Sequence, residues 1–311
     1  MRVIKEWKGL MARDRGAAVA LGNFDGVHRG HQRVIALAAQ AARAAGAPLG
    51  VISFDPHPRR IFQPNAPAFR LMRPAQQARA LEGLGVDLFY VLPFDEEMKS
   101  LTDRDFARAV LHEGLGVRHV SVGFDISFGK GRTGSPATMR DYGETFGFGV
   151  SVAEAVADSQ GEKYSSTAVR DALREGRPQD AAAILGRPFA IEGPVQRGRQ
   201  LGRELGFPTA NVLVDDYVQP RFGVYATRTR LPDGREIPGV ANIGVNPTVG
   251  EVAPVLEVWL FDFDEDIYDQ TIETDLITFL RPEAKFDSLQ EMVDQVMRDA
   301  DQARKILLPD F

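Results

Sequence analysis

Cysteine is absent from the 311-residue chain, and this excludes disulfide bonds, thiolate catalysis and cysteine-ligated zinc. No run of apolar residues is long enough to cross a bilayer, and the first residues lack the apolar core of a secretory signal. Positive charge is in deficit: the formal net charge of −6 argues against broad binding to nucleic acid, although a local basic pocket can still hold a small anion. We expect no membrane or nucleic-acid partner, and the cytoplasm as the default location.

The pattern of apolar and polar residues changes near Gly186, which indicates two domains. Before that point short apolar runs alternate with helical patterns, which predicts a parallel sheet with helices on both faces. After it, alternating β-branched segments predict a small antiparallel barrel or sandwich, followed by one helix that begins near Ser288. The domains are therefore predicted at 1–186 and 187–311.

The expected elements follow from local period and flanking residues. In the first domain the predicted strands are 17–21, 49–54, 86–92, 117–122 and 148–152, and the clearest helices are 32–45 and 103–111. In the second domain the predicted strands are 190–195, 224–230, 237–243, 255–261 and 271–279.

The segment 21–31, LGNFDGVHRGH, places two histidines at a predicted turn from strand to helix. Amide groups and the positive end of the helix favour an anion there, and His28 and His31 add donors on the same face. Gly22 and Gly30 would let the backbone turn tightly and approach a ligand. The segment predicts a phosphate site; the alternative is a pair of ordinary surface histidines.

A second candidate for anion binding is 164–170, YSSTAVR. Here Ser166 is expected to cap a helix, Thr167 to enter its first turn and Arg170 to follow one turn later, with Lys163 just outside. The alternative is an ordinary helix cap. Together with the two histidines, the segment favours nucleotidyl transfer, a reaction that needs aligned and neutralised phosphates but no covalent nucleophile.

The segment 202–211, GRELGFPTAN, stands out in the second domain. It has neither the ending of a Walker A loop nor the spacing of a protein-kinase glycine loop. Thr209 and Asn211 offer neutral oxygen ligands that could support Mg²⁺ bound mainly by a nucleotide. A plain β-turn is the competing interpretation.

Glu257 is the only ionisable residue in the apolar strand predicted at 255–261. An apolar environment raises the pKa of a carboxylate, which suits it to accept a proton from a substrate hydroxyl. The pattern equally allows Glu257 to lie on the solvated face of an edge strand, and the sequence leaves both options open.

Nine segments in order along the chain resemble the bifunctional bacterial riboflavin kinase/FAD synthetases. They are GNFDGVHRGH at 22–31, FDPHPR at 54–59, GFDISFGKGRTG at 123–134, YSSTAVRDAL at 164–173, LGRPF at 185–189, GRELGFPTAN at 202–211, FGVYA at 222–226, GVANIGVNPT at 239–248 and LEVWLFDFDEDIYD at 256–269. The resemblance implies an N-terminal FMN adenylyltransferase with a Rossmann-like nucleotidylyltransferase sheet. It also implies a C-terminal riboflavin kinase with a six-stranded antiparallel barrel and a terminal helix.

The resemblance also implies roles for individual residues. The implied catalytic residues are His28, His31 and Glu257. The implied ATP-binding residues are Gly22, Phe24, Asp25, Gly30, Asp125, Lys163, Ser166, Thr167, Arg170, Gly206, Thr209 and Asn211. The implied flavin-binding residues are Phe54, Pro56, His57, Pro58 and Phe62. Thr209 and Asn211 would also bind Mg²⁺, ATP would be co-substrate, and riboflavin, FMN, FAD, ADP and pyrophosphate would be the remaining substrates and products.

Three positions depart from the resemblance. Lys163 stands where arginine is common, Trp259 replaces a frequent histidine, and Asp269 replaces a frequent glycine, although aspartate tolerates a left-handed backbone. Two other functions compete: a different nucleotidyltransferase fused to an unrelated barrel, and a flavin- or nucleotide-sensing protein that no longer turns over. Incubation with riboflavin and ATP separates all three.

Overall fold

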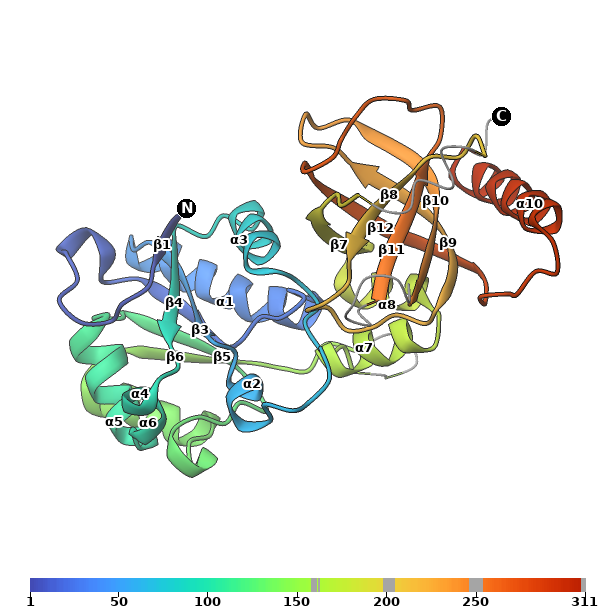
Figure 1. Cartoon of the computed structure of the whole chain (residues 1–311). Coiled ribbons are helices and arrows are strands. Elements are labelled where there is room, and N and C mark those ends of the chain that lie inside the picture. The colour runs from blue at the N-terminus through green and yellow to red at the C-terminus, as the bar shows by residue number, and fades with distance from the viewer. Residues whose placement is uncertain (158–160, 162, 198–204, 246–253, 309–311) are drawn as a thin grey trace. The chain divides into compact units, whose positions relative to one another are not determined.

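A computed structural model describes residues 1–157, 161, 163–197, 205–245 and 254–308 (Figure 1). The chain forms two compact units. Unit 1 comprises Met1–Ala66 and Pro74–Ser165, and unit 2 comprises Pro67–Arg73 and Ser166–Phe311. Parts of two predicted motifs, at 202–204 and 246–248, lie outside the described residues.

Unit 1 is built on six parallel strands in the order β1-β4-β3-β2-β5-β6. The strands are β1 (Arg2–Ile4), β2 (Ala18–Leu21), β3 (Leu49–Asp55), β4 (Leu88–Pro93), β5 (His119–Gly123) and β6 (Gly149–Ala153). The parallel sheet confirms the predicted fold class. Strand β1 was not predicted, because three partly exposed residues give no period to detect.

Helices flank this sheet. They are η1 (Ala12–Asp14), α1 (Arg29–Ala45), α2 (Pro58–Phe62), α3 (Pro74–Gly83), α4 (Glu96–Ser100), α5 (Asp103–Asp105), η2 (Phe106–Gly114), η3 (Lys130–Arg132) and α6 (Pro136–Phe146). All four residues of β2 are buried, and Val19 shares a core with residues of η2 and α6. Helix α1 packs against β2 and β5, so this central strand is covered on both faces and reads as a continuous apolar run.

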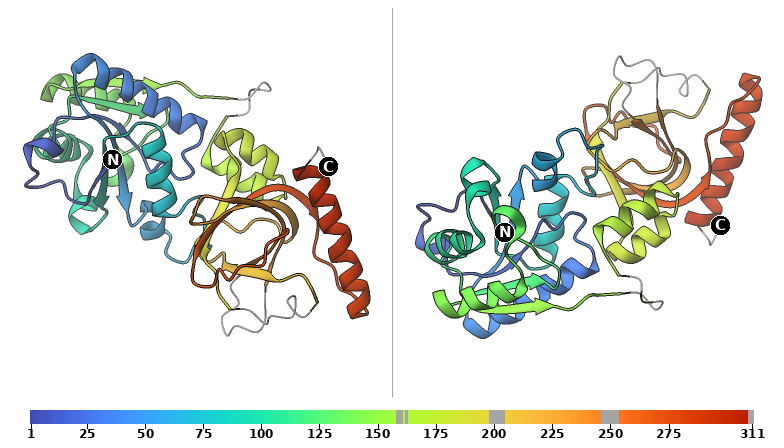
Figure 2. Two further views of the ribbon diagram at one scale, coloured as in Figure 1. Left: turned by 90° about the horizontal axis from the view of Figure 1, so that it is seen from above. Right: turned by 90° about the horizontal axis from the view of Figure 1, so that it is seen from below.

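Unit 2 holds six antiparallel strands in the order β7-β12-β9-β10-β11-β8. The strands are β7 (Phe189–Pro194), β8 (Thr209–Leu213), β9 (Gly223–Arg230), β10 (Glu236–Val245), β11 (Pro254–Leu260) and β12 (Thr271–Arg281). The sheet curls on itself, and α10 (Leu289–Leu307) runs along its outside (Figure 2). Its two ends meet in one antiparallel bridge, where the Gln196 amide donates to the Asn211 carbonyl at 2.8 Å. The predicted barrel and terminal helix are confirmed.

Helices α7 (Ser166–Arg174) and α8 (Pro178–Leu185) precede residue 186, where the sequence predicted the domain boundary, but they pack with the second unit. Val169 and Leu173 of α7 are buried in the same core as the barrel residue Ile191, so both helices belong to unit 2. Residues 67–73 also belong to unit 2, where the backbone amide of Arg70 donates to the Asp216 carbonyl at 3.2 Å. The amphipathic period shows that these helices need a partner but does not say which sheet supplies it.

The partly buried carboxyl of Asp275 on β12 gives a test of the packing around that strand. Burial raises its pKa from the ordinary 3.8 to about 6, and Glu273 adds to the effect, while Arg230 and Arg187 oppose it. Since the folded state binds this proton more tightly than the unfolded chain, the resulting stabilisation is complete below about pH 4 and is lost as the pH rises through about 6.

Replacing the carboxyl with an amide, in Asp275→Asn, should remove a pH-dependent loss of up to about 3 kcal/mol in the free energy of unfolding. Urea unfolding followed by circular dichroism at about pH 5 and about pH 7.5 measures the effect. The free energy of the variant minus that of the natural chain should be larger at the higher pH. A difference that does not change with pH contradicts the prediction.

Candidate active sites

His28 caps helix α1 in unit 1. Its backbone is extended, with φ −67° and ψ 167°, and its Nδ1 accepts a hydrogen bond from the backbone amide of His31 at 3.3 Å. Because Nδ1 accepts, the neutral imidazole carries its proton on Nε2. The side chain is buried. The turn from β2 into α1 therefore holds an oriented imidazole donor at a helix N-terminus.

The backbone that leads to His28 lies in an unusual conformation. Phe24 and Val27 have φ of +52° and +42°, values that non-glycine residues rarely adopt, and both side chains are almost fully buried. The rings of His28 and His31 stack with centroids 3.6 Å apart, and Phe24 meets His31 edge-on at 5.2 Å. Such strain persists only where the surroundings hold it, and it concentrates at functional sites. The structure therefore brings both predicted histidines together.

Gly30 explains the spacing of the two histidines. A Cβ placed on Gly30 would lie 3.0 Å from Cε1 of His28 and 3.3 Å from the carbonyl oxygen of Tyr164. The ring of His28 thus occupies space that any other residue at position 30 would need. Gly22 is less constrained, because its Cβ would meet the Phe24 ring at an ordinary 3.4 Å. Asp25, also predicted to bind ATP, is buried in the same turn.

Lys163 and Asp125, both predicted ATP ligands, pair with each other in unit 1. The Nζ of Lys163 donates to Oδ2 of Asp125 at 2.5 Å and lies 4.2 Å from the centre of the Phe124 ring. Both side chains are exposed. The positive charge that Lys163 retains in place of an arginine is thus within reach of a ligand at the surface.

The predicted flavin-side residues Phe54 and Phe62 belong to a connected row of aromatic rings in unit 1. Phe94 lies between them, with ring centroids 5.8 Å from Phe62 and 5.6 Å from Phe54. Phe106 follows Phe54 at 6.2 Å, and Phe128 follows Phe106 at 5.9 Å. Phe62 ends the row and is 69% exposed. Local sequence patterns do not identify Phe94 and Phe106, because only the fold brings them here.

The remaining predicted flavin residues shape the backbone next to this row. His57 caps α2, since its Nδ1 accepts from the amide of Arg59 at 3.0 Å, and Pro58 is the first residue of that helix. Pro56 lies just before the cap. Proline suits position 58 because the first turn of a helix leaves its amides without helical partners. The peptide bond between Asp55 and Pro56 is cis.

Helix α7 carries the second predicted phosphate motif, within unit 2. The helix begins at Ser166, so Ser166 occupies the first helical position and not the N-cap position that the sequence predicted, and Thr167 follows it. Arg170 is buried, and its Nε donates to the carbonyl of Phe69 at 2.7 Å. Arg170 therefore fastens residues 67–73 to α7, whatever further role its guanidinium has.

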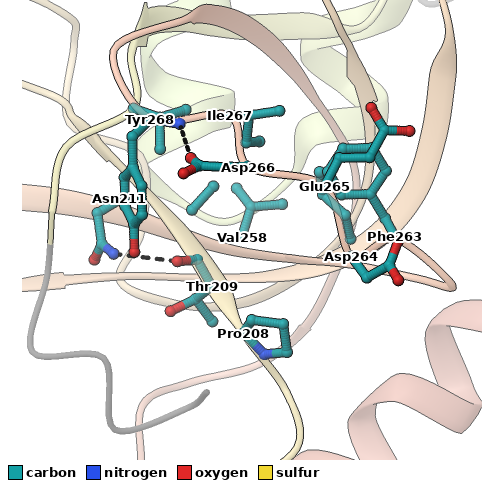
Figure 3. A pocket seen from close by; sticks show the side chains of 13 residues that line it. Pro208, Thr209, Asn211, Val258, Phe263, Asp264, Glu265, Asp266, Ile267 and Tyr268 are labelled. Carbon is teal, nitrogen blue, oxygen red and sulfur yellow. Dashed lines mark hydrogen bonds between the residues drawn. The ribbon is translucent and has the colours of Figure 1, made fainter.

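Two cavities lie in unit 2. The first, here named the loop cavity, has a volume of about 250 Å³ (Figure 3). Its lining residues are Val195, Pro208, Thr209, Ala210, Asn211, Val258, Leu260, Phe263, Asp264, Glu265, Asp266, Ile267 and Tyr268. The second, the helix cavity, has a volume of about 290 Å³. Its lining residues are Leu205, Phe207, Thr209, Val224, Val240, Ala241, Asn242, Glu257, Trp259, Arg281, Glu283, Ala284, Phe286, Met292, Val296 and Asp299. Thr209 lines both.

Glu257 lies in the helix cavity and on an interior strand. Strand β11 pairs with β10 on one side and β8 on the other, which rules out the edge-strand alternative. Directly opposite Glu257 are Asn242 and Asn211, so the three residues form one row on the same face of the sheet. Trp259, two residues along, shares that face and packs on Phe207 at 5.8 Å. A carboxylate thus enters a cavity with aromatic walls.

Thr209 and Asn211 belong to strand β8, so the β-turn interpretation is wrong for these residues. Gly206, which precedes the strand, has φ +89°, a conformation that strongly favours glycine. Asp269 has φ +63°, as expected for a residue that replaces a glycine, and its amide donates to the carbonyl of Val195 at 2.9 Å. The departure at Asp269 therefore leaves the turn beside the loop cavity intact.

The fold and these sites define a two-module phosphate-transferring enzyme, with a nucleotidyltransferase-like parallel sheet and a kinase-like barrel. A family described as FAD synthetase matches residues 10–168, and a family described as riboflavin kinase matches residues 185–307. Bifunctional riboflavin kinase/FMN adenylyltransferases are 40% identical in Pseudomonas fluorescens, over 99% of both chains, and 38% identical in Escherichia coli K12, over 94% of both. The chain belongs to the bifunctional riboflavin kinase/FMN adenylyltransferase family.

A crystal structure described as a macrolide-efflux protein from Streptococcus pneumoniae has the same fold. It matches 97% of this chain and 98% of its own, with a TM-score of 0.86 and 32% sequence identity. Among the residues described for the present chain, no helix is both long and apolar enough to span a membrane.

Substitution of Gly30 tests the histidine site. In Gly30→Ala the new Cβ, 3.0 Å from the His28 ring, should displace the imidazole by a few tenths of an ångström and lower the rate of FAD formation from FMN by about tenfold. Phosphorylation of riboflavin should be unchanged. Chromatography of the flavin products measures both reactions.

Gly83→Ala is the matched control, because a Cβ at position 83 has no neighbour within 4 Å. It should leave both reactions as they are. Full FAD synthesis by Gly30→Ala would show that the position of the His28 ring does not matter.

Proposed function

We propose that the chain makes FAD in two ATP-dependent steps with separate residues. In the first, the terminal ribityl hydroxyl of riboflavin attacks the γ-phosphate of ATP, giving FMN and ADP. In the second, the phosphate of FMN attacks the α-phosphate of a second ATP, giving FAD and pyrophosphate. The observation that carries the proposal is that Thr209 lines both cavities of unit 2, one of which contains Glu257.

For the first step, the loop cavity takes the nucleotide and the helix cavity takes the flavin. The helix cavity has the aromatic rings Phe207, Trp259 and Phe286 in its walls, which suit a flat apolar ring system. The phosphate end of the nucleotide and the hydroxyl of the flavin then meet at Thr209. Glu257 accepts the proton of the attacking hydroxyl.

Mg²⁺ fits this arrangement only as a partner of the nucleotide. The described residues contain no cluster of three or more histidine, cysteine, aspartate or glutamate residues that could hold a metal ion. Thr209 and Asn211 supply neutral oxygens, which suit an ion already bound by phosphates. When bound, Mg²⁺ would neutralise phosphate charge at the point of transfer.

For the second step, the turn at His28 and His31 holds the triphosphate. The Nε2 proton of His28 and the N-terminal amides of α1 provide positive partial charge, and no base is needed because the phosphate of FMN is already ionised. Lys163, in the same unit, is a proposed ligand of the departing pyrophosphate. The aromatic row that ends at Phe62 is proposed to contact the isoalloxazine ring.

Two substitutions should separate the steps. Glu257→Gln keeps the shape of the side chain but cannot accept the proton, and we expect FMN formation to fall by about 100-fold or more while supplied FMN is still converted to FAD. His28→Ala should show the opposite pattern. Equal loss of both reactions in either variant would refute the division of labour. Absence of ATP consumption by the natural chain, with flavin still bound, would favour a sensing protein.

Trp259 allows the flavin cavity to be tested without catalysis. The chain has two tryptophans, and Trp7 lies in unit 1. In a Trp7→Phe variant the fluorescence comes from Trp259 alone, and riboflavin in the helix cavity should quench it through ring contact and energy transfer. Titration with riboflavin measures this quenching. In the counterpart Trp259→Phe, the fluorescence comes from Trp7 alone. If riboflavin quenches the fluorescence of Trp259→Phe but not that of Trp7→Phe, the flavin does not bind in the helix cavity.

A further inference from the structure

The segment between β11 and β12 forms one side of the loop cavity. Residues 263–268 line the cavity, and Pro208, Thr209 and Asn211 face them from the other side (Figure 3). Inside the segment, the amide of Tyr268 donates to Oδ1 of Asp266 at 3.0 Å. Such local bonds shape the turn but do not attach its middle to the sheet.

Phe263, Ile267 and Tyr268 of the segment pack against the barrel core, and Arg235, in the turn between β9 and β10, adds a polar attachment. Its two terminal nitrogens donate to the two carboxylate oxygens of Glu265 at 2.6 and 2.8 Å. Its guanidinium carbon also lies 5.7 Å from the centre of the Phe263 ring. Both Glu265 and Phe263 line the loop cavity, so one side chain from outside the cavity holds two of its lining residues.

Asp233 orients this arginine. Its Oδ2 accepts from Nε of Arg235 at 2.6 Å, and its Oδ1 accepts from the backbone amide of Arg235 at 2.9 Å. All three guanidinium nitrogens are therefore engaged, in the forked geometry that only arginine provides. The hydrogen bonds from Arg235 lower the pKa of Glu265, and those from Glu265 and Asp233 raise the pKa of Arg235.

We propose that Arg235 is a positioning residue for the nucleotide of the kinase reaction. By holding Glu265 and Phe263, it keeps residues 263–268 in the conformation that forms the cavity, and it touches no substrate itself. The inference rests on the proposed assignment of the loop cavity to ATP. An exposed ion pair contributes little to global stability, so the effect should appear in nucleotide binding, where a preformed loop spares the nucleotide the cost of ordering it.

The test is the kinetics of Arg235→Ala in the full chain. We expect the KM for ATP in riboflavin phosphorylation to rise about three- to tenfold, with kcat and the KM for riboflavin within about twofold of the natural values. Calorimetric affinity for ADP should weaken by the same factor. Arg235→Lys keeps the positive charge but cannot form the paired hydrogen bonds of a guanidinium. Its KM for ATP should lie between that of the natural chain and that of Arg235→Ala.

Arg230→Ala is the matched control. Arg230 flanks the same hairpin, its side chain is 46% exposed like that of Arg235, and it pairs with Glu236 and Glu273, which do not line the loop cavity. Its KM for ATP should not change. An unchanged KM for ATP in Arg235→Ala, or an equal rise in Arg230→Ala, overturns the proposal. A natural chain that forms no FMN would instead refute the proposed function.

Discussion

The register between β8 and β11 is the constraint on which the kinase site depends. It sets Asn211 opposite Glu257 and Thr209 opposite Trp259, so an amide, a carboxylate, a hydroxyl and an indole occupy one face of two neighbouring strands. A slip of one residue would turn every side chain of β8 to the other face and place the buried Val212 outside the barrel core. Burial of Val212 therefore fixes the positions of Thr209 and Asn211.

A comparable constraint positions the histidines of unit 1, but there it acts through the backbone. The positive φ angles of Phe24 and Val27 are held by the burial of those same side chains, which places His28 at the cap of α1. The two sites thus position their side chains differently. In unit 2 the regular pairing of β8 with β11 places the functional groups on one face of the sheet, whereas in unit 1 a strained turn orients the imidazole of His28.

The sequence was sufficient where the signal is local. The turn before α1, the cap at Ser288 and the hydrophobic strands are short-range patterns, and the structure confirms them. The sequence did not predict that β8 is a strand, because its five residues lie next to proline and glycine and resemble a turn until a partner strand is known. Whether Glu257 lies on an edge strand is likewise a question of strand order, which alternation does not encode.

Helix α7 begins within the match to one family but packs in the unit that the other family matches. Its first residues fall within the FAD synthetase match, which ends at residue 168, whereas the riboflavin kinase match begins at residue 185. Yet Val169 and Leu173 are buried in the core of unit 2, and Arg170 binds the carbonyl of Phe69 in that same unit. The core of the kinase unit therefore fixes the orientation of a helix whose N-terminal motif belongs, by sequence, to the adenylyltransferase. A separation of the chain at residue 186 would leave the polar motif with one part and most of the apolar surface that supports it with the other.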